Sequence, residues 1–167
     1  TEKKSTASKK ADAPGALRVL DSFLSKESGK SKLSAQGVIA LTNQERHIYG
    51  DLDILLENKE LNASAQKKVD DMFAKQYFEH VSPSGIGVED LATRVGYEYI
   101  IIGENLALGN FKDDQALVAA WMASPGHRAN ILNTHYSEIG VAVGHGMFEG
   151  KDTWLAVQHF GLPRNAC

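Results

Sequence analysis

Six histidines carry the broadest chemistry in this chain of 167 residues. An imidazole titrates close to neutral pH, so it can donate a proton, accept one or ligate a metal ion. Four of the six stand alone in helix, loop or strand patterns, where a histidine is more often a surface or core residue than a functional one: His47, His135, His145 and His159. The surroundings of the other two, His80 and His127, favour a functional role.

Two candidate side chains lie where predicted secondary structure ends. His80 closes a predicted helix and opens a loop rich in proline and glycine. Loops on a rigid scaffold concentrate functional side chains, although a histidine there could also simply cap the helix. Glu104 directly follows a predicted strand over 99–102, so its carboxylate lies either at the wet end of the sheet or buried and paired. Gly103 before it indicates a close backbone approach, and the amide of Asn105 after it can orient a neighbour.

The segment Ser124-Pro125-Gly126-His127 predicts the start of a helix. Serine is a favoured N-cap and proline a favoured first helical residue, which makes His127 the third helical residue, with its backbone N–H within reach of the Ser124 hydroxyl. The positive end of the helix disfavours a charged imidazole, and the neutral form ligates metals or accepts protons. A nucleophilic Ser124–His127 pair is a weaker alternative, because the glycines of a nucleophile elbow are missing.

Apolar periodicity predicts the elements that position these side chains. The expected helices run over 34–49, 62–77, 88–95 and 113–122. Two later strands, 139–144 and 154–160, are separated by a turn within 148–152 and should form an antiparallel hairpin. Because helices come first and strands mostly last, the order predicts an α+β domain with helices packed over an antiparallel sheet. On the second helix we expect these residues to face water: Lys67, Lys68, Asp70, Asp71 and Lys75.

The first 33 residues differ in character from the rest. Residues 1–15 are polar, small and basic, which predicts a flexible tether, and the apolar spacing within 16–25 is compatible with a short helix. The compact domain is expected over 34–165, with Ser34 capping its first helix and Gly50 ending it.

Charge and composition exclude several classes of protein. Residues 1–32 hold eight Lys/Arg and four Asp/Glu, which leaves ten and seventeen in 33–167, a net charge of −7 there. Nucleic-acid binding needs clustered cations, so we expect no nucleic-acid partner. The chain has no apolar run near the ~20 residues that span a bilayer, so no transmembrane segment is expected. Cys167 is the single cysteine, so stability must come from packing without an internal disulfide.

Seven short motifs in order resemble the CAP superfamily (cysteine-rich secretory proteins, antigen 5, pathogenesis-related 1), also called the SCP domain, over about residues 36–162. The motifs are Asn43-x-x-Arg46, a helix closing at His80, Arg94-x-Gly96-Tyr97, Gly103-Glu104-Asn105-Leu106-Ala107, Trp121 through His127, Ile139-Gly140-Val141, and Gln158-x-Phe160-Gly161. The resemblance implies a three-layer α–β–α sandwich with a central antiparallel sheet. It also implies export, so we expect a secreted or cell-envelope associated protein.

The resemblance also implies a cleft built from two histidines and two glutamates. His80 matches the first histidine, Glu104 the first glutamate and His127 the second histidine. Ser124 stands where the second glutamate is expected, and together with the absence of disulfides this is similar to the disulfide-free bacterial branch. The predicted cleft therefore consists of His80, Glu104, Asn105, Ser124 and His127.

Two classes of function are compatible with that cleft. The first is a binding module for a small-molecule, lipid or envelope ligand, or for Zn²⁺ or another divalent cation held by His80, His127 and Glu104 with water as a fourth ligand. The alternative is a hydrolase of peptides or cell-envelope material, in which a metal activates water or these same three residues act as acid and base. A third interpretation gives the cluster a purely structural role. We expect a monomer, and we assign Asn43, Arg46 and Arg94 to structural ties between helices and loops.

Overall fold

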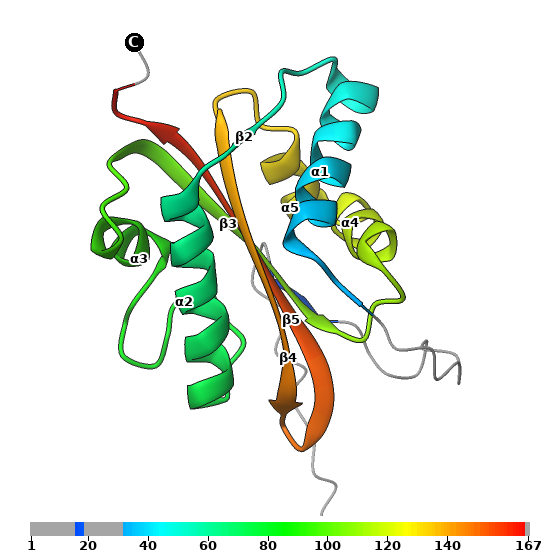
Figure 1. The fold of residues 1–167 in the computed structure, drawn as a ribbon, viewed down its shortest axis with the longest axis vertical. Coiled ribbons are helices and arrows are strands. Elements are labelled where there is room, and N and C mark those ends of the chain that lie inside the picture. Colours follow the sequence, from blue (N-terminus) through cyan, green and yellow to red (C-terminus); the bar gives the residue numbers. More distant parts are fainter. Residues whose placement is uncertain (1–15, 19–31, 166–167) are drawn as a thin grey trace, which may run out of the picture.

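The computed structural model describes residues 16–18 and 32–165, and these form ten helices and strands (Figure 1). The five helices are α1 (Ala35–Gly50), α2 (Lys59–Lys75), α3 (Val88–Arg94), α4 (Asp114–Met122) and α5 (Pro125–Ile131). The five strands are β1 (Ala16–Arg18), β2 (Leu56–Glu57), β3 (Tyr99–Gly109), β4 (Glu138–Phe148) and β5 (Lys151–Pro163). Within the described part of the chain, no helix combines the length and apolar character that crossing a membrane requires.

Three long antiparallel strands form the centre of the sheet. The strand order is β1-β3-β5-β4-β2, with β5 paired to both β3 and β4 in antiparallel register. The predicted hairpin is confirmed: β4 and β5 are joined by Glu149 and Gly150, both with positive φ, as tight hairpin turns favour. Two short strands lie at the edges of the sheet: β1 pairs in parallel with β3, and β2 pairs in parallel with β4. Neither edge strand was predicted.

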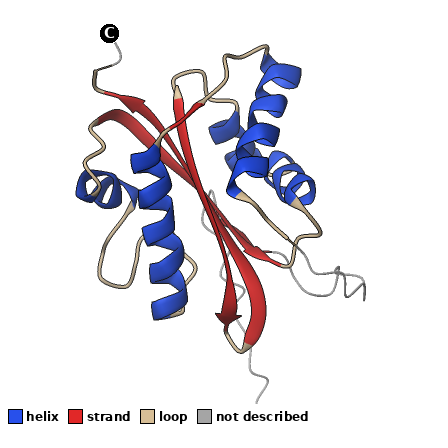
Figure 2. Ribbon diagram, in the orientation of Figure 1, coloured by secondary structure: helices blue, strands red, loops and turns tan. Residues whose placement is uncertain are grey.

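Helices cover both faces of this sheet, so the predicted α–β–α sandwich is confirmed. Helices α2 and α3 lie on one side of the strands, and α1, α4 and α5 lie on the other (Figure 2). Side chains alternate accordingly along β5: Leu155 and Val157 pack in the core under α2, while Ala156 and Phe160 join the core under the other three helices. This alternation follows from the two-residue period of a strand, and it decides which face each polar residue of the sheet meets.

The helix ends differ from the predicted ones by a few residues. Ser34 caps α1 as predicted, its hydroxyl accepting from the N–H of Gly37 at 3.1 Å. The helix continues through Gly50 and ends at Asp51, which adopts the left-handed conformation with φ 46°. Helix α2 begins three residues before the predicted 62, because Asn58 caps it by accepting from Leu61 N–H at 3.0 Å.

Strand β3 is longer than predicted, which corrects the position of Glu104. The expected strand ended at 102, but β3 continues to Gly109 and carries Glu104 in its middle. Polar residues suggested a strand end, yet in the register Glu104 faces His159 and Asn105 faces Gln158. Polar side chains on adjacent strands can therefore pair inside the sheet, where burying either one without a partner would cost free energy.

The short helix considered for 16–25 is not what the described residues form. Ala16–Arg18 are a strand that pairs with Leu106–Leu108 at the edge of β3. The backbone of an edge strand offers unpaired N–H and C=O groups, and these can draw a passing segment into the sheet whatever its own periodicity. The remainder of that stretch, and most of the tether predicted over 1–33, lie outside the described residues.

Arg46 is a buried tie between α1 and two loops, as its motif predicted. Its side chain is 2% exposed. The Nε donates to the carbonyl of Asp53 at 2.9 Å, and Nη1 donates to the carbonyls of Ile131 and Asn133 at 2.8 Å each. Asn43, one turn earlier, exchanges two hydrogen bonds with the backbone of Leu55. The two side chains fix the loop after α1 and the end of α5.

Replacing Arg46 with methionine should therefore destabilise the fold. Arg46→Met keeps most of the apolar stem but removes three charge-assisted hydrogen bonds to carbonyl oxygens, so we expect a loss of about 3 kcal/mol in the free energy of unfolding. Urea denaturation followed by circular dichroism measures it. The exposed Arg164→Met is the matched control, with an expected change within about 0.5 kcal/mol. Equal effects of the two substitutions would show that the buried hydrogen bonds contribute little.

Candidate functional site

The Glu104 carboxylate is the centre of a buried polar cluster. Its Oε1 lies 2.7 Å from Nδ1 of His80, and its Oε2 lies 2.7 Å from Nε2 of His159. The side chain of Glu104 is 2% exposed. Burial by itself would raise the pKa of this carboxyl, but the hydrogen bonds from His159 and His80 and the positive charge of Lys68 outweigh it and hold the pKa at about 2. Glu104 is therefore ionised at neutral pH.

The ionised carboxylate fixes the protons of both imidazole rings. A carboxylate can only accept hydrogen bonds, so the ring nitrogens that face it, Nδ1 of His80 and Nε2 of His159, both carry hydrogen. In a neutral His80 ring the lone pair then lies on Nε2. The side chain of His80 is 27% exposed, whereas that of His159 is fully buried. His80 is therefore the member of the cluster through which an outside molecule can reach it.

Ser64 anchors the far side of the cluster. Its hydroxyl lies 2.6 Å from Nδ1 of His159 and donates to the carbonyl of Leu61 at 3.0 Å. A serine, a histidine and a glutamate in a hydrogen-bonded line have the geometry of a nucleophilic triad. However, Ser64 is fully buried in the side of α2 that faces the sheet, where no substrate can reach its oxygen. Its contacts instead hold the His159 ring in place.

Lys68 corrects one prediction, because it does not face water. It is 1% exposed, and its ammonium group donates to the carbonyl of His80 at 2.9 Å and to the hydroxyl of Tyr77 at 3.3 Å. Burial lowers the pKa of Lys68, and the nearby Glu104 charge opposes that shift. The lysine thus brings a compensating charge and ties the loop that carries His80 to α2. Its place on the helix was readable, since 61, 65, 68 and 72 lie on one helical face.

Asn105 belongs to a second polar network, made with the helices on the other side of the sheet. Its amide donates to the Gln158 side chain at 3.1 Å and to the backbone carbonyl of His127 at 3.2 Å. Asn130 of α5 donates to the Asn105 side-chain oxygen at 2.8 Å and to the carbonyl of Glu104 at 3.2 Å. Gln158 in turn donates to the Thr42 hydroxyl on α1 at 2.8 Å. This network docks α1 and α5 onto the sheet.

Ser124 and His127 pair with each other, but not in the way that the sequence predicted. Ser124 occupies the N-cap position of α5 with Pro125 at the first helical position, as expected. Its hydroxyl bonds to Nδ1 of the His127 ring at 2.8 Å, and it makes no side-chain cap to the backbone. His127 is 3% exposed. A functional role for this pair stays a prediction.

The metal site expected from His80, Glu104 and His127 is not assembled. Among the described residues, no three His, Cys, Asp or Glu side chains are arranged to hold a metal ion. Both carboxylate oxygens of Glu104 already accept hydrogen bonds from histidines, and a ligating oxygen would have to give one up. The donor set present suits a hydrogen-bonded cluster better than a three-ligand zinc centre.

His159 is the member of the cluster that sequence reasoning missed. A histidine alone in a strand pattern predicts a surface or core residue and no more. The alternation of Leu155, Val157 and His159 was nevertheless a usable signal, because it places the histidine on the same buried face as two core residues. A fully buried imidazole needs hydrogen-bond partners for its ring nitrogens, and the structure supplies them in Ser64 and Glu104.

Comparison with known proteins gives one family and bacterial relatives. The sequence model of the cysteine-rich secretory protein family, CAP, matches residues 39–160. The chain is 40% identical over 129 residues to the uncharacterized protein YkwD of Bacillus subtilis (strain 168), covering 76% of this chain and 48% of that protein. It is 36% identical over 74 residues to the uncharacterized membrane protein YlbC of the same strain, covering 44% and 21%. It thus spans less than half of either relative.

Solved structures agree on the fold. An extracellular protein containing an SCP domain from Bacillus anthracis str. Ames superposes with a TM-score of 0.64 at 28% identity, covering 76% of this chain and 39% of that one. An outer surface protein from Borrelia burgdorferi superposes with a TM-score of 0.67 at 19% identity, covering 77% of this chain and 92% of that one. A cysteine-rich secretory protein from Staphylococcus aureus superposes with a TM-score of 0.59 at 20% identity, covering 77% of this chain and 38% of that one. The last two likenesses, below 25% identity, concern the fold alone.

The pH dependence of stability tests the ionised Glu104. Its folded pKa of about 2 lies below the reference value of 4.5, so its stabilising contribution is present above pH 4.5 and is lost as the pH falls toward 2. We expect Glu104→Gln to cost about 3 kcal/mol at pH 7 and progressively less below pH 4.5. Urea denaturation at pH 7, 5, 4 and 3 measures both proteins, with the exposed Glu98→Gln as control. A difference that stayed constant across that range would contradict an ionised, histidine-bonded Glu104.

Proposed function

Because the chain belongs to the CAP family of cysteine-rich secretory proteins, we propose that it is an exported binding domain whose His80–Glu104–His159 cluster receives a small polar ligand at His80. Its relatives support the export half of the proposal: the Bacillus anthracis protein is an extracellular protein that contains an SCP domain. We infer that the ligand is a small molecule or a fragment of the cell envelope, because those are the molecules that an exported domain of this kind meets.

One observation carries the ligand half of the proposal: an accessible imidazole is held in a single orientation by a buried, ionised carboxylate. Nδ1 of His80 is fixed by Glu104 at 2.7 Å, and the backbone of His80 is fixed by Lys68 at 2.9 Å. A ring that is held at Nδ1, on a backbone that is itself fixed, loses little further entropy when a ligand binds. A partly exposed imidazole held in this way suits a ligand that carries hydrogen-bonding groups, such as a hydroxyl or an amide.

A metal ion is the less favoured occupant of the same place. A histidine that ligates a metal through one ring nitrogen commonly donates the N–H of the other to a carboxylate, and Glu104 stands in that position toward His80. A single imidazole is a weak site, however, and Glu104 and His159 are engaged with each other. A lipophilic ligand is also less favoured, because the groups that converge on Glu104 are polar.

A second candidate function is acid–base hydrolysis at His80. The Glu104–His80 contact has the form of a base and its orienting carboxylate. The neutral ring could take a proton from water through Nε2, while Glu104 stabilises the imidazolium that results. The substrate would be a peptide or cell-envelope material.

Ligand binding at His80 can be followed by NMR of the histidine rings. We expect ¹⁵N shifts that place the proton of the neutral His80 ring on Nδ1, and a change in the Nε2 signal when solubilised peptidoglycan fragments are added. His80→Gln should abolish the binding of those fragments, because it removes the imidazole ring that Glu104 orients. His47→Gln, on an exposed ring, should leave the binding unchanged. Identical titrations of the wild type and His80→Gln would rule out the proposed site.

Turnover separates the second candidate from the first. If His80 is a general base, mass spectrometry of digests of peptidoglycan or of a peptide library should detect products with the wild type. Glu104→Gln should reduce the rate about 100-fold or more, since the ring loses its orienting carboxylate. Products that formed equally fast with Glu104→Gln would dissociate hydrolysis from this cluster, and binding without products would leave the binding function standing.

A further inference from the structure

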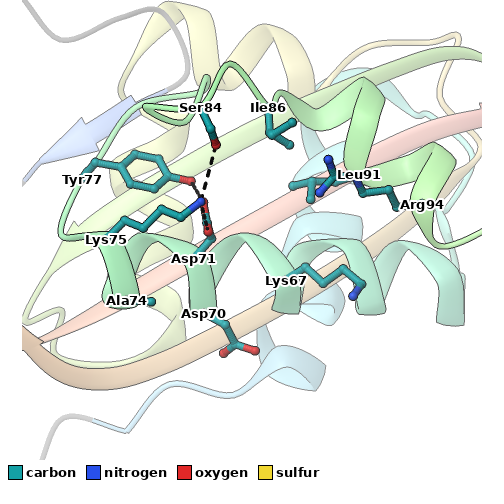
Figure 3. Close-up of a pocket in the computed structure, with 10 residues that line it drawn as sticks. All are labelled: Lys67, Asp70, Asp71, Ala74, Lys75, Tyr77, Ser84, Ile86, Leu91 and Arg94. Carbon is teal, nitrogen blue, oxygen red and sulfur yellow. Dashed lines mark hydrogen bonds and ion pairs between the residues drawn. The ribbon is translucent and has the colours of Figure 1, made fainter.

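A separate pocket lies between α2, the loop after it and α3 (Figure 3). Its volume is about 610 Å³, within the range of small-molecule sites. His80, Glu104 and His159 do not line it. The pocket is therefore distinct from the Glu104 cluster, and a ligand bound there would be independent of the function proposed for that cluster.

At one end of the pocket the charged side chains are paired with each other. The two carboxylate oxygens of Asp71 are engaged, one by the ammonium group of Lys75 at 2.9 Å and the other by the Tyr77 hydroxyl at 2.6 Å. Lys75 also lies 3.5 Å from the Ser84 hydroxyl. Figure 3 shows these four side chains gathered at one end of the pocket. This end offers neutral hydrogen-bonding groups and a compensated ion pair.

The other end carries two cations that form no ion pair with any residue in the described part of the chain. Lys67 and Arg94 extend from the facing helices α2 and α3 (Figure 3), and no hydrogen bond or ion pair joins their side chains to any residue that the structure describes. Arg94 therefore does not form the structural tie expected of it. Asp70 also borders the pocket, but its carboxylate turns away in Figure 3 and accepts from Gln66 at 2.8 Å. An unpaired positive end is notable because residues 33–167 have a net charge of −7.

Apolar side chains lie next to these cations. Ile86 and Leu91 line the pocket above α2 (Figure 3), Leu91 buried and Ile86 half-buried. Two cations beside an apolar wall match a carboxylate that has an apolar group on the adjacent carbon, and a neutral polar end farther along matches amide groups. We propose that this pocket binds the free C-terminal carboxylate of a short peptide that ends in an apolar residue.

The polar far end distinguishes a peptide from a fatty acid. Both ligands present a carboxylate to Lys67 and Arg94, but a long alkyl chain would have to lie over the Asp71–Lys75 ion pair and the Ser84 hydroxyl and desolvate them without replacing their hydrogen bonds. A peptide backbone supplies its own donors and acceptors there.

Isothermal titration of the intact chain with a synthetic peptide tests this assignment. The probe is acetyl-Ala-Ala-Leu with a free carboxylate, and its C-terminal amide is the uncharged comparison. We expect the acid to bind at least tenfold more tightly than the amide, because a carboxylate forms charge-assisted hydrogen bonds with both cations. The double variant Lys67→Gln/Arg94→Gln should weaken binding of the acid at least tenfold.

The control is a second double variant with the same change in net charge. Lys59→Gln/Arg164→Gln removes one lysine of the same helix and one exposed arginine away from the pocket, and it should leave the affinity within about twofold, since exposed charges at a distance are largely screened. Circular dichroism checks that both variants are folded. Equal affinity for acid and amide, equal weakening by the two double variants, or tighter binding of decanoate than of the peptide would each overturn the proposal.

Discussion

A carboxylate in the middle of a sheet is costly to bury, and much of this domain is arranged to compensate the one at Glu104. Two imidazoles occupy its two oxygens, and a buried ammonium group lies close enough to act on its charge. Each partner comes from a different element: the loop after α2 supplies His80, β5 supplies His159 and α2 supplies Lys68. Removing any of these would leave a buried charge or a buried ring nitrogen unsatisfied, so the site and the packing of α2 depend on one another.

The two faces of β3 divide the polar residues between two tasks. Glu104 meets the α2 side, where one imidazole of its cluster remains accessible, and Asn105 meets α1 and α5 through a network that reaches Thr42. The second network is buried and joins backbone and amide groups. It fixes layers that apolar contacts alone would allow to slide. Glu104 thus belongs to the candidate site and its neighbour Asn105 to the contacts that hold the layers together, because consecutive side chains of a strand point to opposite faces.

The loop after α2 connects this cluster to the pocket at α3. Lys68 donates to the carbonyl of His80 and to the hydroxyl of Tyr77, and Tyr77 donates to Asp71 at the edge of the pocket. A short chain of hydrogen bonds therefore joins the backbone of the exposed histidine to the pocket wall. The same lysine thus ties the loop to α2 both at the His80 backbone and at the Tyr77 side chain.

The amino-acid sequence by itself determined the family, the α+β class, the helices and the hairpin, because periodicity, caps and turn residues act over a few neighbours. It also indicated His80 and Glu104, and the tie made by Arg46. The tertiary structure alone decided that β3 extends past Glu104, that His159 and Lys68 join the cluster and that Arg94 faces a pocket. Those outcomes depend on which strands pair and in what register, and a residue far along the chain, such as His159 opposite Glu104, becomes a partner only when the sheet forms.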